Sequence, residues 1–99
     1  MIDLALISGF EWDRGNARKN DKHGVTMAEA EQVFFNQPLL LLADTKHSVS
    51  ETRFYALGKC NDDRYLQITF TLRARGTLIR VISARDMNRK ERSIYEQAK

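Results

Sequence analysis

Residues 65–83 read YLQITFTLRARGTLIRVIS, and this stretch decides the fold. From Tyr65 to Leu72 apolar and polar residues alternate, which is the pattern of a strand with one buried face. Residues 78–83 are mostly apolar and leave little polar face, which favours a central strand. Arg75-Gly76-Thr77 lies between the two and has the residues of a hairpin turn. The stretch therefore predicts two adjacent antiparallel strands.

More strands are predicted on the N-terminal side of this hairpin. Residues 39–43 and 52–59 are apolar and of strand length, and Asn61-Asp62-Asp63 supplies the next turn. An antiparallel meander of four strands is therefore expected. Short apolar pieces at 2–7 and 10–12 predict an opening strand segment, interrupted at Ser8-Gly9.

Two helices are predicted between the opening strand and the meander. Asp13 is placed to cap a short polar helix over 14–22, which Gly24 would end in a left-handed conformation. Thr26 has a glutamate three residues later, the spacing of a capping box, and begins a second helix that runs to Pro38.

A final helix is predicted after the meander, because Ser83 and Asp86 also have the spacing of a cap. This helix would run toward Gln97. The order of elements indicates an α+β domain with an antiparallel sheet of four to five strands, two N-terminal helices and one C-terminal helix. We expect all three helices on one side of the sheet.

The composition is that of one small domain, which we expect to span residues 1–99. With 42% hydrophobic and 29% charged residues, the chain excludes a large multi-layer enzyme. Its longest apolar run, 39–43, is far short of the roughly 18 residues that a membrane helix needs. No signal-peptide pattern is present, so we expect a cytoplasmic protein without a membrane partner.

No pattern for a disulfide, a metal or a cofactor is present. Cys60 is the one cysteine and cannot form an internal disulfide, while His23 and His47 are isolated from any second ligand of suitable spacing. We therefore expect no cofactor and a fold stabilised by its core.

Positive charge is concentrated at the C-terminal end. Residues 1–72 carry 8 Lys/Arg against 10 Asp/Glu, whereas residues 73–99 carry 8 against 3. On the predicted final helix Arg85, Arg89 and Arg92 would share one face, where like charges repel each other. A polyanion or an acidic protein surface would relieve this repulsion. The alternative is that Glu91 and Glu96 balance the charge and the cations only solvate an ordinary helix.

Three segments resemble a known family: 10–34, 47–58 and 79–95. They include FEWD at 10–13, NDKHGV at 20–25, and IRVISAR at 79–85 followed by RKER at 89–92. In this order and spacing they are similar to the BrnT ribonuclease toxins. Asn16 departs from the pattern, because members often have Lys there, and its presence removes one possible phosphate contact from the first helix.

The resemblance implies a type II toxin with a RelE-like α+β fold that cleaves RNA and arrests translation. It further implies an adjacent antitoxin similar to BrnA, which would mask the toxin in a hetero-oligomer and repress the operon. The alternative is a non-catalytic basic module that binds nucleic acid or an acidic protein.

Metal-independent RNA cleavage uses the ribose 2'-hydroxyl as the nucleophile and needs a base, an acid and cations around the phosphate. Arginines in or at the ends of strands would supply the cations. For the base we favour His23, because the charge of Lys22 favours a neutral imidazole; the alternative is that His23 donates to carbonyls at the helix end. His47 is either the acid or a surface residue. Glu91 is more suited to orienting arginines than to carrying a proton.

The predicted site therefore has two groups of residues. The catalytic group is His23, Arg53, Arg80, Arg85, Glu91 and Arg92. The RNA-binding group is Lys22, Arg89, Lys90 and Tyr95, of which Tyr95 would stack on a base or pack in the core.

Overall fold

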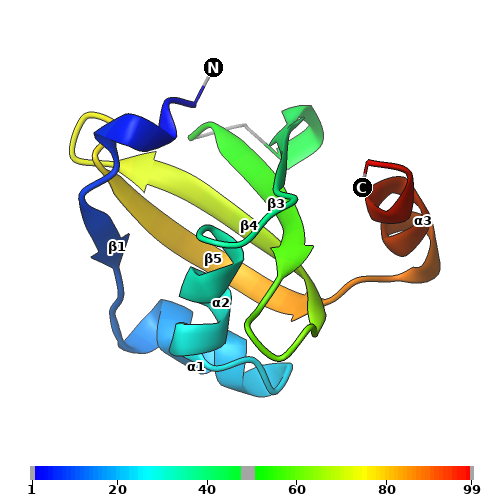
Figure 1. Ribbon diagram of the computed structural model, residues 1–99. Coiled ribbons are helices and arrows are strands. Elements are labelled where there is room, and N and C mark those ends of the chain that lie inside the picture. Colours follow the sequence, from blue (N-terminus) through cyan, green and yellow to red (C-terminus); the bar gives the residue numbers. More distant parts are fainter. Residues whose placement is uncertain (1, 48–50, 99) are drawn as a thin grey trace.

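A five-stranded sheet forms the centre of the computed structural model, with the strand order β1-β5-β4-β3-β2 (Figure 1). The structure describes residues 2–47 and 51–98, without the side chains of residues 19–22 and 47. The strands are β1 (Gly9–Glu11), β2 (Leu40–Asp44), β3 (Arg53–Lys59), β4 (Tyr65–Arg73) and β5 (Leu78–Asp86). Strands β2 to β5 form the predicted antiparallel meander, and β1 pairs with β5 in parallel. The α+β class is confirmed.

Three helices flank this sheet, with two short 3₁₀ turns in the connections. In chain order they are η1 (Leu4–Leu6), α1 (Arg14–Lys22), α2 (Met27–Val33), η2 (Thr45–His47) and α3 (Arg89–Gln97). The first two predicted caps are confirmed. Asp13 accepts the backbone N–H groups of two residues in the first turn of α1, and Thr26 forms a capping box with Glu29 at the start of α2.

Helix α2 packs its apolar side on one face of the sheet. Ala30 and Val33 of this helix are fully buried with Ile68, Phe70 and other strand residues in a single core cluster. Gly58 on β3 allows the close approach, because a Cβ atom at this position would lie 2.8 Å from a methyl group of Val33. This face of the sheet is therefore the core.

A bulge in β5 changes which side chains share a face. Val81 pairs with Phe70 and Ser83 pairs with Thr69, so Ile82 is an additional residue on β5. Without the bulge, Arg80 and Arg85 would point to opposite faces, because strand side chains alternate. With it, both lie on the face opposite α2.

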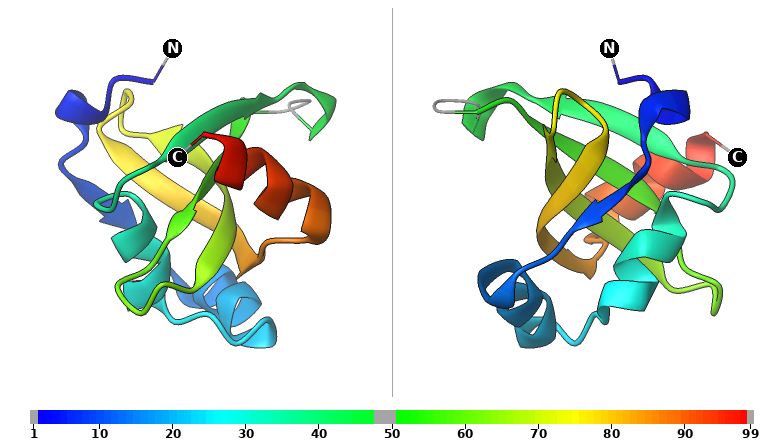
Figure 2. Two further views of the ribbon diagram at one scale, coloured as in Figure 1. Left: turned by 45° about the vertical axis from the view of Figure 1, so that its right-hand side comes forward. Right: turned by 90° about the vertical axis from the view of Figure 1, so that its left-hand side faces the viewer.

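Helix α3 lies on that second face, so the expectation of all helices on one side is wrong. In the right-hand view of Figure 2, α2 is in front of the sheet and α3 is behind it. Tyr95 of α3 is fully buried and contacts the ring of Tyr65, with 5.2 Å between centroids. The turn at Met87–Asn88 brings the chain back over the sheet and allows this contact.

The final helix also begins later than predicted. β5 continues to Asp86 rather than ending at Ser83, and Asn88 caps α3 in a capping box with Glu91. Pairing with β4 continues to the end of β5 and outweighs the local capping signal at Ser83. Arg85 therefore lies on a strand, and the predicted face shared with the arginines of the final helix does not form.

The N-terminal segment differs from its prediction as well. Residues 2–7 do not form a strand, because Asp3 accepts the N–H of Ala5 at 3.0 Å and caps the 3₁₀ turn η1. The opening strand is limited to β1, which begins at Gly9 and ends at Glu11.

Helix α2 is shorter than predicted. It ends at Val33, five residues before Pro38, where the sequence placed its end. The chain turns at Phe34, whose ring packs edge-on against Phe70 with 5.1 Å between centroids. Partial burial of this ring against the core accompanies the early end of the helix.

Candidate active site

The face of the sheet opposite α2 is polar. Cross-strand pairs place its residues in rows, since Leu57 pairs with Gln67 and Gln67 pairs with Arg85. We name this the polar face, and its polar side chains include Asp44, Arg53, Tyr55, Tyr65, Gln67, Thr69, Thr71, Arg73, Arg80, Ser83 and Arg85. Four arginines from three strands therefore lie on one rigid surface.

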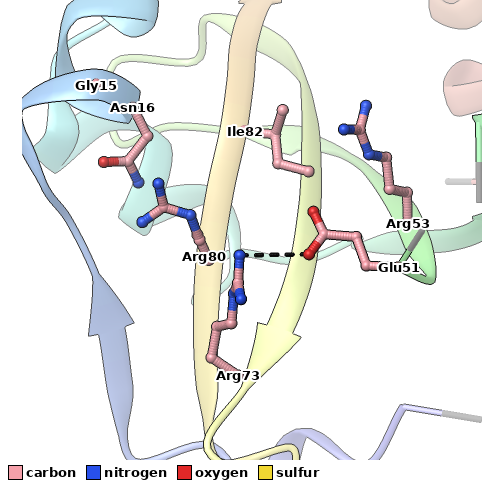
Figure 3. Close-up of a pocket in the computed structure, with 7 residues that line it drawn as sticks. All are labelled: Gly15, Asn16, Glu51, Arg53, Arg73, Arg80 and Ile82. Carbon is pink, nitrogen blue, oxygen red and sulfur yellow. Dashed lines mark ion pairs between the residues drawn. The ribbon is translucent and has the colours of Figure 1, made fainter.

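A cavity of about 320 Å³ lies at one end of the polar face (Figure 3). It is lined by Gly15, Asn16, Glu51, Arg53, Arg73, Arg80 and Ile82, and we name it the arginine pocket. Its volume is at the lower end of the ~300–1,000 Å³ found for small-molecule sites. A pocket of this size and charge suits one phosphate with the sugar attached to it.

Two carboxylates hold Arg80 in the arginine pocket. Its Nη1 donates to Glu11 Oε1 at 3.0 Å, and its Nη2 lies 2.8 Å from Asp13 Oδ2. Burial opposes the charge of Arg80, but the bonds to Asp13 and Glu11 raise its pKa above the ordinary value. The pKa of Asp13 is lowered, by the backbone N–H of Asn16 and then by Arg80. The guanidinium is therefore charged and fixed.

Arg73 lies beside Arg80 in the pocket (Figure 3) and forms an ion pair with Glu51. Arg73 Nη2 lies 3.3 Å from Glu51 Oε2, and Arg73 Nε lies 4.0 Å from Glu11 Oε1. Figure 3 shows the Glu51 carboxylate between Arg73 and Arg53, which comes from β3. The pocket therefore combines three guanidinium groups with one carboxylate on its rim.

Asn16 joins α1 to the sheet beneath the pocket. It is 4% exposed, and its Nδ2 donates to the carbonyls of Glu11 and Val81, both at 2.9 Å. Its Oδ1 accepts the N–H of Asp13 at 2.6 Å. Asn16 thus fixes the backbone of the two acidic residues that hold Arg80. Its role in the site is structural and does not depend on contact with a phosphate.

A second cavity, of about 450 Å³, lies between α3 and the polar face. We name it the helix groove. Arg85 and Glu91 form a two-pronged ion pair there, with Nη1–Oε1 at 2.7 Å and Nη2–Oε2 at 2.9 Å. Burial opposes the charge of Glu91, but Arg85 and the N–H of Asn88 outweigh it and lower the pKa of Glu91. Glu91 is held as the charged partner of Arg85.

His23 does not join the predicted arginines. It is exposed in the connection between α1 and α2, and its carbonyl accepts from Arg64 Nη2 at 3.5 Å. Arg64 is itself paired with Asp86 at 2.7 Å, not with the neighbouring Asp62 or Asp63. His23 lines neither the arginine pocket nor the helix groove. The side chains of Lys22 and His47 lie outside the described residues.

The cations of α3 are exposed, whereas Tyr95 is not. Arg89, Lys90 and Arg92 lie on the surface, and the Arg92 guanidinium is 4.9 Å from the centre of the Tyr65 ring. The hydroxyl of Tyr95 donates to the carbonyl of Pro38 at 2.7 Å. A fully buried ring cannot stack on an RNA base, so Tyr95 packs in the interior.

Five polar residues of the arginine pocket and its support were not among the predicted site residues: Glu11, Asp13, Asn16, Glu51 and Arg73. Arg73 could have been found, because it belongs to the basic segment and continues the alternation of β4. Glu51 could not, since it precedes β3 in a connection with no periodic pattern.

Neither a metal centre nor a membrane span is recognisable in the part of the chain that the structure describes. No group of three His, Cys, Asp or Glu side chains in residues 2–47 and 51–98 is arranged to hold a metal ion. Over the same residues, every helix is too short or too polar to cross a membrane.

Comparison with known proteins adds the family. Residues 12–91 match the ribonuclease toxin BrnT of type II toxin–antitoxin systems. No match was found among curated proteins. The matched range covers the lining of the arginine pocket, from Gly15 to Ile82, and the Arg85–Glu91 pair. The chain therefore belongs to the BrnT family of ribonuclease toxins, whose type II systems pair such a toxin with an antitoxin protein.

Proposed function

We propose that this toxin, acting as a single domain over residues 1–99, cleaves RNA without a metal ion, by attack of the ribose 2'-hydroxyl on the adjacent phosphate. The observation that carries the proposal is the arginine pocket, in which Arg53, Arg73 and Arg80 surround one cavity. Cleavage of cellular RNA in this way would arrest translation.

The pocket suits this reaction because negative charge builds on the phosphate in the transition state. Guanidinium groups that are already oriented stabilise this charge without reorganising, and removal of one such donor costs about 3 kcal/mol, or ~100-fold in rate. Arg80 is oriented by Glu11 and Asp13, and Arg73 is oriented by Glu51. Each arginine has five N–H donors, so donors remain for a phosphate.

The other predicted residues take positions along the RNA in this proposal. Arg85, held by Glu91, lies farther along the polar face, and Lys90 lines the helix groove beside it. With Arg89 and Arg92 they would contact phosphates flanking the cleaved one. The proposal gives His23 no role in proton transfer, because this residue lines neither cavity.

We also propose that an antitoxin similar to BrnA neutralises the protein in a hetero-oligomer. The exposed cations of α3 and the polar face would be covered by acidic groups of that partner. This follows from charge, since residues 73–99 carry 8 Lys/Arg against 3 Asp/Glu.

The experiment is RNA cleavage by the purified protein in excess EDTA. We expect cleavage to persist and to leave a 2',3'-cyclic phosphate and a 5'-hydroxyl. Arg80→Ala should lose about 100-fold in rate, whereas Arg18→Ala, which removes an exposed cation of α1 outside both cavities, should cleave normally. Activity that is lost on chelation would contradict a metal-independent mechanism. Intact RNA with salt-dependent binding would favour a non-catalytic binding module.

A further inference from the structure

We propose that Glu51 is the general base that removes the proton from the attacking 2'-hydroxyl. This inference rests on the proposed function, because it assigns the proton acceptor in the same pocket. Glu51 lines the arginine pocket together with Arg53, Arg73 and Arg80. It is the carboxylate residue among the pocket's lining, and Figure 3 shows its side chain between Arg73 and Arg53.

The other carboxylates near the polar face are buried, bound to fixed partners through both oxygens, or absent from the lining of the pocket. Asp44, which pairs with Arg53 across β2 and β3, is only 3% exposed. Asp13 accepts from two backbone N–H groups and from Arg80. Both oxygens of Glu91 accept from Arg85, and one of them also accepts the N–H of Asn88. Glu11 contacts Arg80 and Arg73 through Oε1 alone, but it does not line the arginine pocket. Asp13, Glu91 and Glu11 serve to hold arginines.

Glu51 differs from Asp13 and Glu91 in its contacts, and from Glu11 in that it lines the arginine pocket. Its Oε2 lies 3.3 Å from Arg73 Nη2, and over the described residues its Oε1 has no hydrogen-bond or ion-pair partner. Its side chain is 31% exposed, so a substrate can reach it. One oxygen is thus oriented by Arg73 while the other is available to accept a proton.

The geometry of RNA requires a base and phosphate-binding groups side by side. The 2'-hydroxyl and the phosphate that it attacks are attached to neighbouring carbons of one ribose. Guanidinium groups that hold the phosphate therefore bring the hydroxyl to the rim of the same cavity, where Glu51 lies. A base that meets the hydroxyl within hydrogen-bond reach contributes about 10²–10⁴-fold in rate.

The step balances without another reactant. The proton passes from the 2'-hydroxyl to Glu51, the 2'-oxygen forms a bond to phosphorus, and the bond from phosphorus to the 5'-oxygen breaks. The leaving oxygen takes a proton from water. The products are a 2',3'-cyclic phosphate and a 5'-hydroxyl, and Glu51 returns its proton to solvent.

The test compares Glu51→Gln with the wild type in single-turnover cleavage of a short RNA in EDTA from pH 4 to 9. We expect the wild-type rate to decline toward acid pH, and we expect Glu51→Gln to be slower by about 10²–10⁴-fold and to lose this decline. Binding of a 2'-O-methyl RNA, which cannot be cleaved, should be retained or slightly tighter. Asp62→Asn makes the same charge change in the exposed β3–β4 turn and should behave as the wild type.

Two further variants separate a base from a residue that only orients Arg73. Glu51→Asp keeps a carboxylate and should retain a reduced rate with the acid decline. Arg73→Ala should be slower but also keep the acid decline.

If Glu51→Gln keeps that decline, Glu51 is not the base, whatever the cleavage rate of this variant. If the wild type itself does not cleave, the proposed function fails, and the base assignment fails with it. If the wild type and Glu51→Gln cleave equally, the base assignment alone fails.

Discussion

Three arginines on the polar face are each held by a carboxylate from another element. Arg73 is held by Glu51, Arg80 by Glu11 and Arg85 by Glu91. A free arginine side chain loses rotamer freedom when it binds a ligand, which costs up to about 2 kcal/mol. Here that ordering already takes place on folding. The carboxylates lower the net charge of the site and in return fix the directions of its donors.

At the scale of residues, the sequence predicts which charged groups take part better than it predicts their positions. It proposes Arg53, Arg80 and Arg85 because they fall in or at the ends of strands, and all three lie on the polar face. Glu51 was missed, since its closeness to Arg73 depends on how β3 and β4 pair. Tyr95 was placed among the RNA contacts, but its ring is buried against Tyr65. A single tyrosine in a helix carries no local signal of which neighbour covers it.

Tyr95→Phe tests this buried position. The substitution removes the hydroxyl that donates to the Pro38 carbonyl at 2.7 Å and leaves that oxygen without this donor. We expect the free energy of unfolding to fall by about 1 kcal/mol, measured by urea denaturation. The cleavage rate should stay within twofold of the wild type. An unchanged unfolding free energy would show that the hydroxyl makes no effective bond in solution.

At the scale of elements, the C-terminal half of β5 decides where the site forms. The bulge at Ile82 turns Arg80 and Arg85 to the same face, and the extension to Asp86 keeps Arg85 on the sheet. The meander, α1 and the start of α2 were predictable from alternation and capping residues. The bulge and the end of β5 were not predictable from local sequence patterns, because both depend on how β5 pairs with β4 across the hairpin.

Two residues near the start of α3, Ser83 and Asn88, have the sequence pattern of a helix cap. Substitution of each by alanine shows which of them caps the helix. Ser83 has an acidic residue three positions later, and so does Asn88, but only Asn88 caps α3. Asn88→Ala should lower the free energy of unfolding by about 1 kcal/mol. Ser83→Ala should change it by less than about 0.5 kcal/mol, because a strand residue loses no cap. Both are measured by urea denaturation. A larger loss for Ser83→Ala than for Asn88→Ala would place the start of the helix at Ser83 in solution.

At the scale of the whole molecule, the positive charge falls into two parts. One is the arginine pocket, and the other is the exposed surface of α3 formed by Arg89, Lys90 and Arg92, which we name the α3 track. The arginine pocket is balanced by acidic neighbours, whereas the three cations of α3 are exposed to solvent. Attraction of RNA from a distance should therefore depend on α3, and the rate of the chemical step should depend on the pocket. Arg73, Arg80 and the cations of α3 all belong to the basic segment 73–99, so the sequence alone could not separate the two parts.

The salt dependence of RNA binding separates the two. A cation that neutralises one phosphate of a single strand contributes about 0.7 to the slope of log K against log salt. Replacement of Arg89, Lys90 and Arg92 by glutamine should therefore reduce the slope by about 2, measured with 2'-O-methyl RNA between 50 and 300 mM salt. At saturating RNA the cleavage rate should stay close to that of the wild type, because the pocket is intact. Arg18→Gln, in exposed α1, serves as the control and should leave the slope unchanged. An unaltered slope in the triple variant would mean that RNA does not contact α3. The RNA would then have to bind along the polar face of the sheet alone.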